Sequence, residues 1–460
     1  MTTDTIEEPP AQETATTRSE RVGWYFYDWA ASAFNTTVVT VFLGPYLLGV
    51  ARTAAGCPGD QECDGRTVNL FGFDLLPGSV FPLAVSVSVF LTVFVLPVVG
   101  AIADRSAHKK QLLALFAYVG AAATVANVFV AGTRFELGAV LLIVANVAFG
   151  ASIVIYNSFL PQIAGPDERD AVSSRGWAIG YLGGGLLLAL NVVAVFLGDT
   201  LGADTADIAR YCIASAGLWW AGFTTIPLLR LRNRPPVEPV LGDRSVIVAG
   251  FVQLGRTLKG MRAFPLTLGF LAAYLVYNDG IQTVITLASV YGTDELKLPA
   301  EVLVSTILMV QFLAFAGALA LGALARRIGA WKTVLGSLVL WTVVLALAYF
   351  LPARQPLLFI ALGGLIGIVL GGSQALSRSL FSQLIPRGKE AEYFGFYEIS
   401  DKGTSWLGPL LFALAYQLTG SYRVAIISLV AFFAIGFLGL LAVPMRRAIE
   451  QAGNVPPRVL

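Results

Sequence analysis

Long apolar stretches separated by short polar ones run through the chain from residue 24 to residue 444. A helix needs about 20 mainly apolar residues to cross the hydrocarbon core of a bilayer, and the pattern predicts twelve such spans. Their predicted bounds are residues 24–48, 79–102, 111–132, 137–160, 173–198, 211–229, 264–291, 302–325, 332–351, 357–380, 394–418 and 422–444. The predicted fold class is an all-α membrane protein with twelve transmembrane helices.

Composition agrees with this pattern, because 56% of the residues are hydrophobic, only 13% are charged and the mean hydropathy is +0.73. Soluble domains carry roughly 25% charged residues. The basic residues are scattered between apolar stretches and form no continuous basic face, which excludes a nucleic-acid partner. The expected partners are the lipid bilayer and a small-molecule substrate, and the chain is expected to be a monomer without a cofactor.

Lysine and arginine concentrate in alternate loops between the predicted spans. Because cytoplasmic loops carry an excess of these residues, the pattern predicts a multi-pass protein of the plasma membrane with both termini in the cytoplasm. The charges assigned to inner loops include Arg105, Lys109, Arg326, Arg327, Arg378 and Arg387.

The longest inner loop separates six predicted spans from the next six, and its later part has apolar residues at helical spacing that predict an amphipathic surface helix. Residues 1–20 are rich in proline, threonine and glutamate, which predicts a disordered tail. The predicted parts are a tail (1–20), a six-helix bundle (21–229), a cytoplasmic linker (230–262), a second six-helix bundle (263–445) and a C-terminal tail (446–460).

An internal repeat supports the two halves. The stretch GAIADRSAHKK (residues 100–110) follows the second predicted span, and GALARRIGAWK (residues 322–332) follows the eighth. The separation between these two stretches along the chain also aligns Glu168 with Glu390. Parallel repeats of six helices with a substrate site between them are a known plan for transporters.

The stretch at residues 100–110, a glycine followed by Asp-Arg and a basic cluster, resembles the cytoplasmic loop signature of the major facilitator superfamily (MFS). The two six-helix halves extend this resemblance over the whole chain. The second copy of the loop departs from the pattern, because Arg326 stands where an aspartate would match Asp104.

Three further stretches resemble a narrower branch, the vacuole-effluxer family of autophagy-related amino-acid exporters and their bacterial relatives. They are YDWAASAF (27–34), YNDGIQT (277–283) and the residues from Gly395-Phe396-Tyr397 through Lys402 to Leu407-Gly408-Pro409. The resemblance implies export of amino acids by alternating access.

The expected inner gate contains charged residues at the cytoplasmic ends of the spans. The resemblance implies that Asp104 and Arg105 tie neighbouring helices together in one conformation and release them in the other. Asp28 lies about one turn inside the first predicted span, where an inner Arg or Lys can reach it, so we expect it in the gate rather than at the coupling site. Lys109, Arg326 and Arg327 complete the gating candidates, with positive-inside anchoring as the alternative.

Asp279 lies near the bilayer midplane in the seventh predicted span. A carboxylate there requires a polar partner or a water-filled cavity, and its protonation would couple substrate movement to a proton gradient. The alternative is a structural carboxylate hydrogen-bonded to a neighbouring helix.

Five more polar residues of the predicted spans are candidates for substrate contact or, alternatively, for hydrogen bonds between helices. They are Asn278, Gln282, Asn35, Gln374 and Lys402. Lys402 has a second alternative, an ion pair with Glu398 one turn earlier.

Cys57 and Cys63 flank a short polar segment of the first outer loop, and a disulfide between them is predicted on the oxidising side. Metal ligation is not expected in this loop.

These features favour a secondary active transporter that exports a small solute, with amino acids as the expected substrate and protons as the expected coupling ion. A sugar–cation symporter and a multidrug exporter are alternatives of the same fold. A receptor or scaffold without transport is an alternative of another class. A single histidine and the lack of a nucleophile–base motif disfavour an enzyme. The sequence also has no Walker-type nucleotide-binding motif, so transport driven by an ATPase of this chain is not expected.

Overall fold

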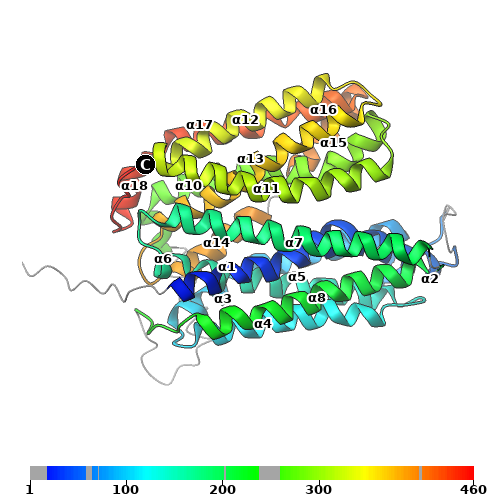
Figure 1. Cartoon of the computed structure of the whole chain (residues 1–460), viewed down its shortest axis with the longest axis horizontal. Coiled ribbons are helices and arrows are strands. Elements are labelled where there is room, and N and C mark those ends of the chain that lie inside the picture. The colour runs from blue at the N-terminus through cyan, green and yellow to red at the C-terminus, as the bar shows by residue number, and fades with distance from the viewer. Residues whose placement is uncertain are drawn as a thin grey trace, which may run out of the picture.

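Helices form most of the part of the chain that the computed structural model describes (Figure 1), which is residues 18–57, 65–70, 72–200, 202, 204–237, 259–402 and 407–460. Within these residues, ten helices are long and apolar enough to cross a membrane. Two of the twelve predicted spans are not among the ten, the seventh and the eleventh. The helix α10 (Pro265–Val290) lies at the place of the seventh, and the pair α14 (Glu390–Lys402) and α15 (Leu407–Thr419) lies at the place of the eleventh.

The N-terminal half consists of seven long or medium helices, short helical turns and one small hairpin. Its elements are α1 (Arg18–Ala33), the π-helix η1 (Phe34–Phe42), α2 (Leu43–Ala54), β1 (Val68–Leu70), β2 (Phe73–Leu75), η2 (Pro77–Ser79), α3 (Val80–Arg105), α4 (Lys109–Val125), η3 (Ala126–Phe129), α5 (Phe135–Asn157), α6 (Leu160–Ile163), α7 (Arg169–Thr200) and α8 (Thr205–Arg230). The strands β1 and β2 pair antiparallel, with Asn69 opposite Asp74.

The C-terminal half repeats the long-helix pattern. Besides α10, α14 and α15 it contains η4 (Met261–Ala263), η5 (Tyr291–Glu295), α11 (Ala300–Ile328), α12 (Ala330–Phe350), α13 (Pro356–Gln383), α16 (Tyr422–Ser428), α17 (Val430–Ala442) and α18 (Met445–Gln451). Helix starts follow the local sequence. Asp204 accepts a hydrogen bond from the backbone N–H of Ala206 at the start of α8, and prolines occupy the first turns of α10 and α13, where a missing N–H costs nothing.

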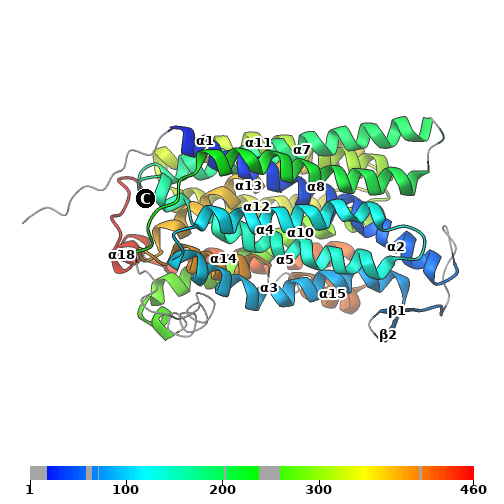
Figure 2. The same ribbon diagram turned by 90° about the horizontal axis from the view of Figure 1, so that it is seen from below.

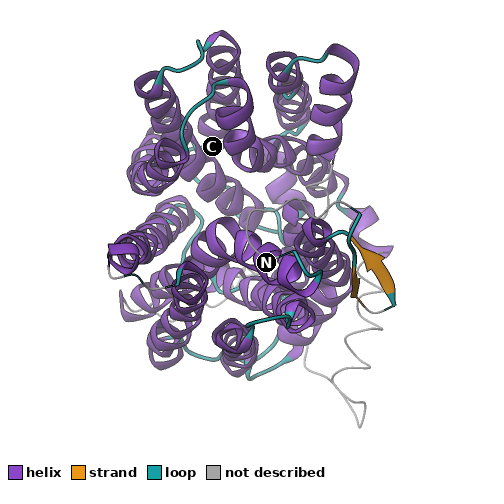
Figure 3. Cartoon of the chain, turned by 90° about the vertical axis from the view of Figure 1, so that its right-hand side faces the viewer, coloured by secondary structure: helices purple, strands orange, loops and turns teal. Residues whose placement is uncertain are grey.

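Each half has its own apolar core. One core is built from residues of α1 to α8 together with Ala391, and the other from residues of η4 to α18. We call the end of the bundle where α1 begins and α18 lies the inner end, which the sequence predicts to be cytoplasmic, and the opposite end, which carries the hairpin, the outer end (Figures 1 and 2). Seen from the outer end, the helices form two groups (Figure 3).

The halves meet through a few helices. Helix α7 packs against α11 and α13, and α14 packs against α3 and α5. Glycine permits close approaches here, since a Cβ on Gly395 of α14 would lie 3.0 Å from the carbonyl oxygen of Leu96 in α3.

Candidate functional site

A buried ion pair joins the two halves near the inner end. Both terminal nitrogens of Arg378 in α13 lie 3.2 Å from Oδ2 of Asp28 in α1. The Tyr156 hydroxyl of α5 donates to the same oxygen at 2.6 Å. Arg378 is only 2% exposed and Asp28 9%, so water screens their attraction weakly.

Aromatic rings enclose the guanidinium. Its central carbon lies 4.7 Å from the ring centre of Trp24, 5.4 Å from that of Trp177 and 5.6 Å from that of Tyr156. Trp24 stacks on Tyr156 and donates from its indole nitrogen to the Tyr156 carbonyl oxygen. Ring faces attract a cation placed over them. Gly176 permits this arrangement, because a Cβ there would lie 2.7 Å from Oδ2 of Asp28.

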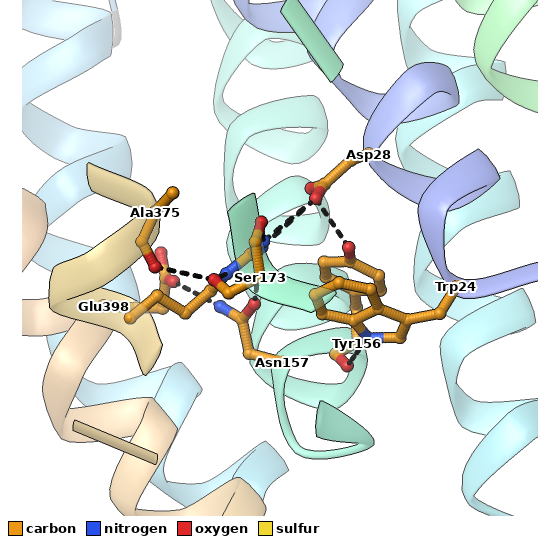
Figure 4. Close-up of polar contacts among 8 residues, drawn as sticks. Trp24, Asp28, Tyr156, Asn157, Ser173, Ala375 and Glu398 are labelled. Atoms are coloured by element: carbon orange, nitrogen blue, oxygen red, sulfur yellow. Dashed lines mark hydrogen bonds and ion pairs between the residues drawn. The ribbon is translucent and has the colours of Figure 1, made fainter. Parts of the chain in front are cut away.

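Further hydrogen bonds extend the pair into a network that crosses the interface repeatedly (Figure 4). Arg378 donates to the Ser173 side chain and carbonyl at 2.9 and 3.0 Å and to Oδ1 of Asn157 at 3.3 Å. Asn157 in turn donates to Oε1 of Glu398 at 3.0 Å, and Ser173 donates to the Ala375 carbonyl at 2.7 Å. We call these residues, with Trp24, Asp28 and Tyr156, the inner cluster.

A second contact between the halves lies at the ends of α3 and α14. Asp104, the predicted gating carboxylate, accepts hydrogen bonds at 2.9 Å from the backbone N–H groups of Ala391 and Glu392 in the first turn of α14. Lys109 lies 3.1 Å from the same carboxylate. A helix N-terminus presents unpaired N–H groups and a partial positive charge, so Asp104 caps a helix that belongs to the other half.

The first turn of α7 adds a third set of contacts. Arg169 donates to the Ser382 carbonyl at 2.8 Å and to the Gln383 side chain at 3.1 Å, and the Ser379 hydroxyl donates to Asp170. The inner cluster, the Asp104 cap and this first turn of α7 all lie where the two halves meet at the inner end.

A polar network within the C-terminal half brings two predicted substrate residues together. Gln374 of α13 donates to Oδ1 of Asn278 at 2.8 Å, and Asn278 donates to Oδ1 of Asp401 at 2.8 Å. The Tyr274 hydroxyl also donates to that oxygen, at 2.9 Å. Asn278 and Tyr274 come from α10 and Asp401 from α14, so the network fixes three helices relative to one another.

Asp279, the predicted coupling residue, lies outside this network. It is 1% exposed, its carboxylate lies against Gly408 of α15, whose backbone N–H acts on it, and no described side chain donates a hydrogen bond to it. It lies about 21 Å along α10 from the helix start, at 1.5 Å per residue. The Thr283 hydroxyl, one turn further along, is likewise buried without a hydrogen bond to the described residues.

Other predicted site residues lie apart from these groups. Asn35 is exposed in η1, and Gln282 is half-buried in α10. Arg326 and Arg327 are exposed at the end of α11, and no ion pair joins them to the described inner-end residues. Arg105 is half-buried and follows Asp104 in the chain, and Lys109 forms an ion pair with Asp104.

Some predictions fall on residues outside the description. The Lys402 side chain and the predicted amphipathic segment up to residue 258 lie there. Glu398, the alternative partner of Lys402, bonds to Asn157. Cys57 is disulfide-bonded, whereas Cys63 lies outside the described residues, so their pairing stays a prediction.

The assignment of Arg378 to an inner loop is wrong, because this residue lies within α13 and is buried. Apolar patterning places Arg378 at the end of a span, where an arginine usually anchors the helix. The signal that could have found its role is Asp28, which needs a cation at the same depth in the other half.

Comparison with known sequences gives a match over nearly the whole chain. Residues 16–453 match the family model described as Vacuole effluxer Atg22 like. The chain is 29% identical over 439 residues to the uncharacterized MFS-type transporter YxiO of Bacillus subtilis, covering 94% of this chain and 97% of that one. It is 26% identical over 561 residues to autophagy-related protein 22-1 of Penicillium rubens, covering 98% and 94%.

Solved structures share the fold at low sequence identity. A bacterial homologue of the iron transporter ferroportin in its outward-facing state superposes with a TM-score of 0.65 at 14% identity, covering 92% of this chain and 98% of that one. The MFS transporter FucP in its outward conformation gives 0.64 at 13% identity, covering 92% and 99%. The chain therefore has the major facilitator fold.

Proposed function

Because the chain belongs to the Atg22-like vacuole effluxer family, we propose that this MFS transporter exports amino acids by alternating access in exchange for protons. The observation that carries the proposal is the set of contacts at the inner end. Charges of opposite halves, Asp28 and Arg378, meet there with the Asp104 cap of α14. Such contacts form and break as units, which suits two discrete conformations.

Two conformations require that the inner contacts separate when the halves rock apart. While the inner contacts are formed, the inner cluster blocks passage between the two halves to the inner end. Asn35 lies in η1, which continues α1 from Asp28 toward the outer end, and is exposed. This supports an outward-facing state in which the substrate space opens toward the outer end.

Proton coupling is assigned to Asp279. Burying a charged carboxylate that has no ion-pair partner costs far more free energy than burying its protonated form. Movement that brings water to Asp279 on one side of the membrane would let the proton leave there. This change of protonation state with conformation is what coupling requires.

The test is transport by the purified chain in proteoliposomes, using a panel of radiolabelled amino acids, sugars and cationic drugs. An acidic lumen is expected to accelerate amino-acid uptake, because export against proton entry is an antiport. Acceleration by an acidic exterior would identify symport and contradict export. Flux restricted to sugars or drugs would overturn the amino-acid assignment, and no flux for the whole panel would overturn transport.

Asp279→Asn is expected to abolish the response to the pH gradient while amino-acid counterflow persists, because the amide carries no exchangeable charge. The matched control is Asp294→Asn, which removes a carboxylate that is exposed in η5 of the same half. Unchanged gradient-driven uptake in Asp279→Asn would remove Asp279 from the coupling role. If Asp28→Asn alone lost coupling, the role would pass to Asp28.

A further inference from the structure

Asp401 is a half-buried carboxylate well inside the membrane-spanning region. It lies about 16 Å along α14 from Glu390, at 1.5 Å per residue. Carboxylates at such depth face the interior of a helix bundle or a water-filled space, because contact with lipid is too costly. The accessible part of Asp401 therefore faces a polar space inside the protein.

The orientation of this carboxylate is set by two donors on one oxygen. Tyr274 and Asn278, one turn apart on α10, both donate to Oδ1 of Asp401. Asn278 also donates to the Asp401 carbonyl oxygen at 3.2 Å, and Gln374 holds the Asn278 amide. A carboxylate fixed in this way is preorganised, so a ligand that binds it does not have to order it.

The Tyr274 ring lies beside Asp401, because its hydroxyl donates to that carboxylate, and it stacks on Tyr397. Tyr181 of α7, in the other half, is partly buried and packs against the core that contains both of these rings. The Trp177 ring centre is 5.5 Å from that of Tyr181. A fixed carboxylate beside aromatic rings is the combination that recognises an organic cation, through a charge-assisted hydrogen bond and a ring face.

We propose that Asp401 binds the ammonium group of the transported solute, with Tyr181 of the opposite half as the facing ring. The site deepens the function proposed above and rests on it. Tyr274, Asn278 and Gln374 are positioning residues that hold Asp401. Because the ligand would touch both halves, its binding would report on their separation.

The test measures thermal stabilisation of the purified full chain by amino acids and simple amines, and then by paired derivatives of each compound that binds. The methyl ester of an amino acid keeps the ammonium and loses the carboxylate, whereas the N-acetyl form does the reverse. A ligand that binds the folded state raises its melting temperature. We expect the esters to bind and the N-acetyl forms to bind about tenfold more weakly or worse, as loss of a charge-assisted contact implies.

Asp401→Asn is expected to weaken ammonium ligands about tenfold or more, measured as the shift from that variant's own melting temperature without ligand. Asp294→Asn is the control and should bind as the native chain does. The ring is tested separately, because Tyr181→Leu should weaken binding and Tyr181→Phe should restore it.

N-acetyl forms that bind as well as their parents, or Asp401→Asn binding like the native chain, would overturn the ammonium site. Failure of every amino acid and amine to bind would overturn it as well. A chain that moved only sugars or anions in proteoliposomes would keep its alternating-access mechanism and lose this site, so the two failures are distinguishable.

Discussion

Arg378 has five N–H donors, and five hydrogen bonds to Asp28, Asn157 and Ser173 use them. A buried charge costs free energy unless it is paired and hydrogen-bonded, and here both conditions are met only while the halves touch. Separation of the halves removes most of these acceptors at once. The guanidinium therefore makes the inner contact specific to one conformation.

Arg378→Lys is expected to open the inner end. The lysine ammonium keeps the charge, but it cannot make the five hydrogen bonds of the guanidinium or lie flat over the aromatic rings. A buried ion pair that loses one partner costs about 3–5 kcal/mol, and the lysine variant should lose part of this. The measurement is maleimide labelling of Ser382→Cys, a buried inner-end position, in a Cys212→Ala background. Labelling should become about tenfold faster, which corresponds to ~1.4 kcal/mol.

The conservative control is Arg446→Lys, at an exposed arginine of α18, and it should label at the original rate. Equal labelling rates for Arg378→Lys and the parent would show that the guanidinium contacts do not hold the inner end closed.

At the scale of elements, both repeated loops follow a glycine that packs against a helix of the other half, but their charged residues make different contacts. Gly100 of α3 lies against the start of α14, and its repeat counterpart Gly322 of α11 lies against Ser174 near the start of α7. The first copy adds Asp104 as a cap on α14. The second copy has the exposed Arg326 at that place, and a cation cannot accept from helix N–H groups.

The two glycines give a matched pair of substitutions. A Cβ at Gly100 would overlap the carbonyl of Ala391, which is backbone, whereas a Cβ at Gly322 would meet only the Ser174 side chain. Overpacking of this kind costs about 1–3 kcal/mol, and a backbone neighbour yields less than a side chain. We expect Gly100→Ala to speed Ser382→Cys labelling more than Gly322→Ala does. The reverse order would mean that the α3–α14 contact is not part of the closed inner end.

At the scale of the whole molecule, apolar periodicity predicted the helical membrane fold well, because each span must satisfy its backbone internally. The repeated loops at residues 100–110 and 322–332 predicted two halves, because a repeat can be recognised from the local sequence alone. Partner choice was not accessible in this way. The ion pair of Asp28 with Arg378, like the hydrogen bonds that Asn278 and Tyr274 donate to Asp401, depends on how helices distant in sequence pack. Taken one at a time, the charged residues also fit the simpler role of anchors at a helix end.

Alternating access predicts that a covalent link between the halves at the inner end stops transport. Asp170 of α7 and Ser379 of α13 are in hydrogen-bond contact, so this pair is the one to test for a disulfide, which needs Cβ atoms about 3.8 Å apart. Oxidation of the Asp170→Cys/Ser379→Cys double variant should abolish flux, and a reductant should restore it.

The control links Ser88 to Asn146, a 2.6 Å contact within the N-terminal half, through cysteines at both positions. Oxidation should leave that variant active, because rocking moves each half as a body. If the link between the halves left flux unchanged while the disulfide was shown to form, transport would not require the inner end to open.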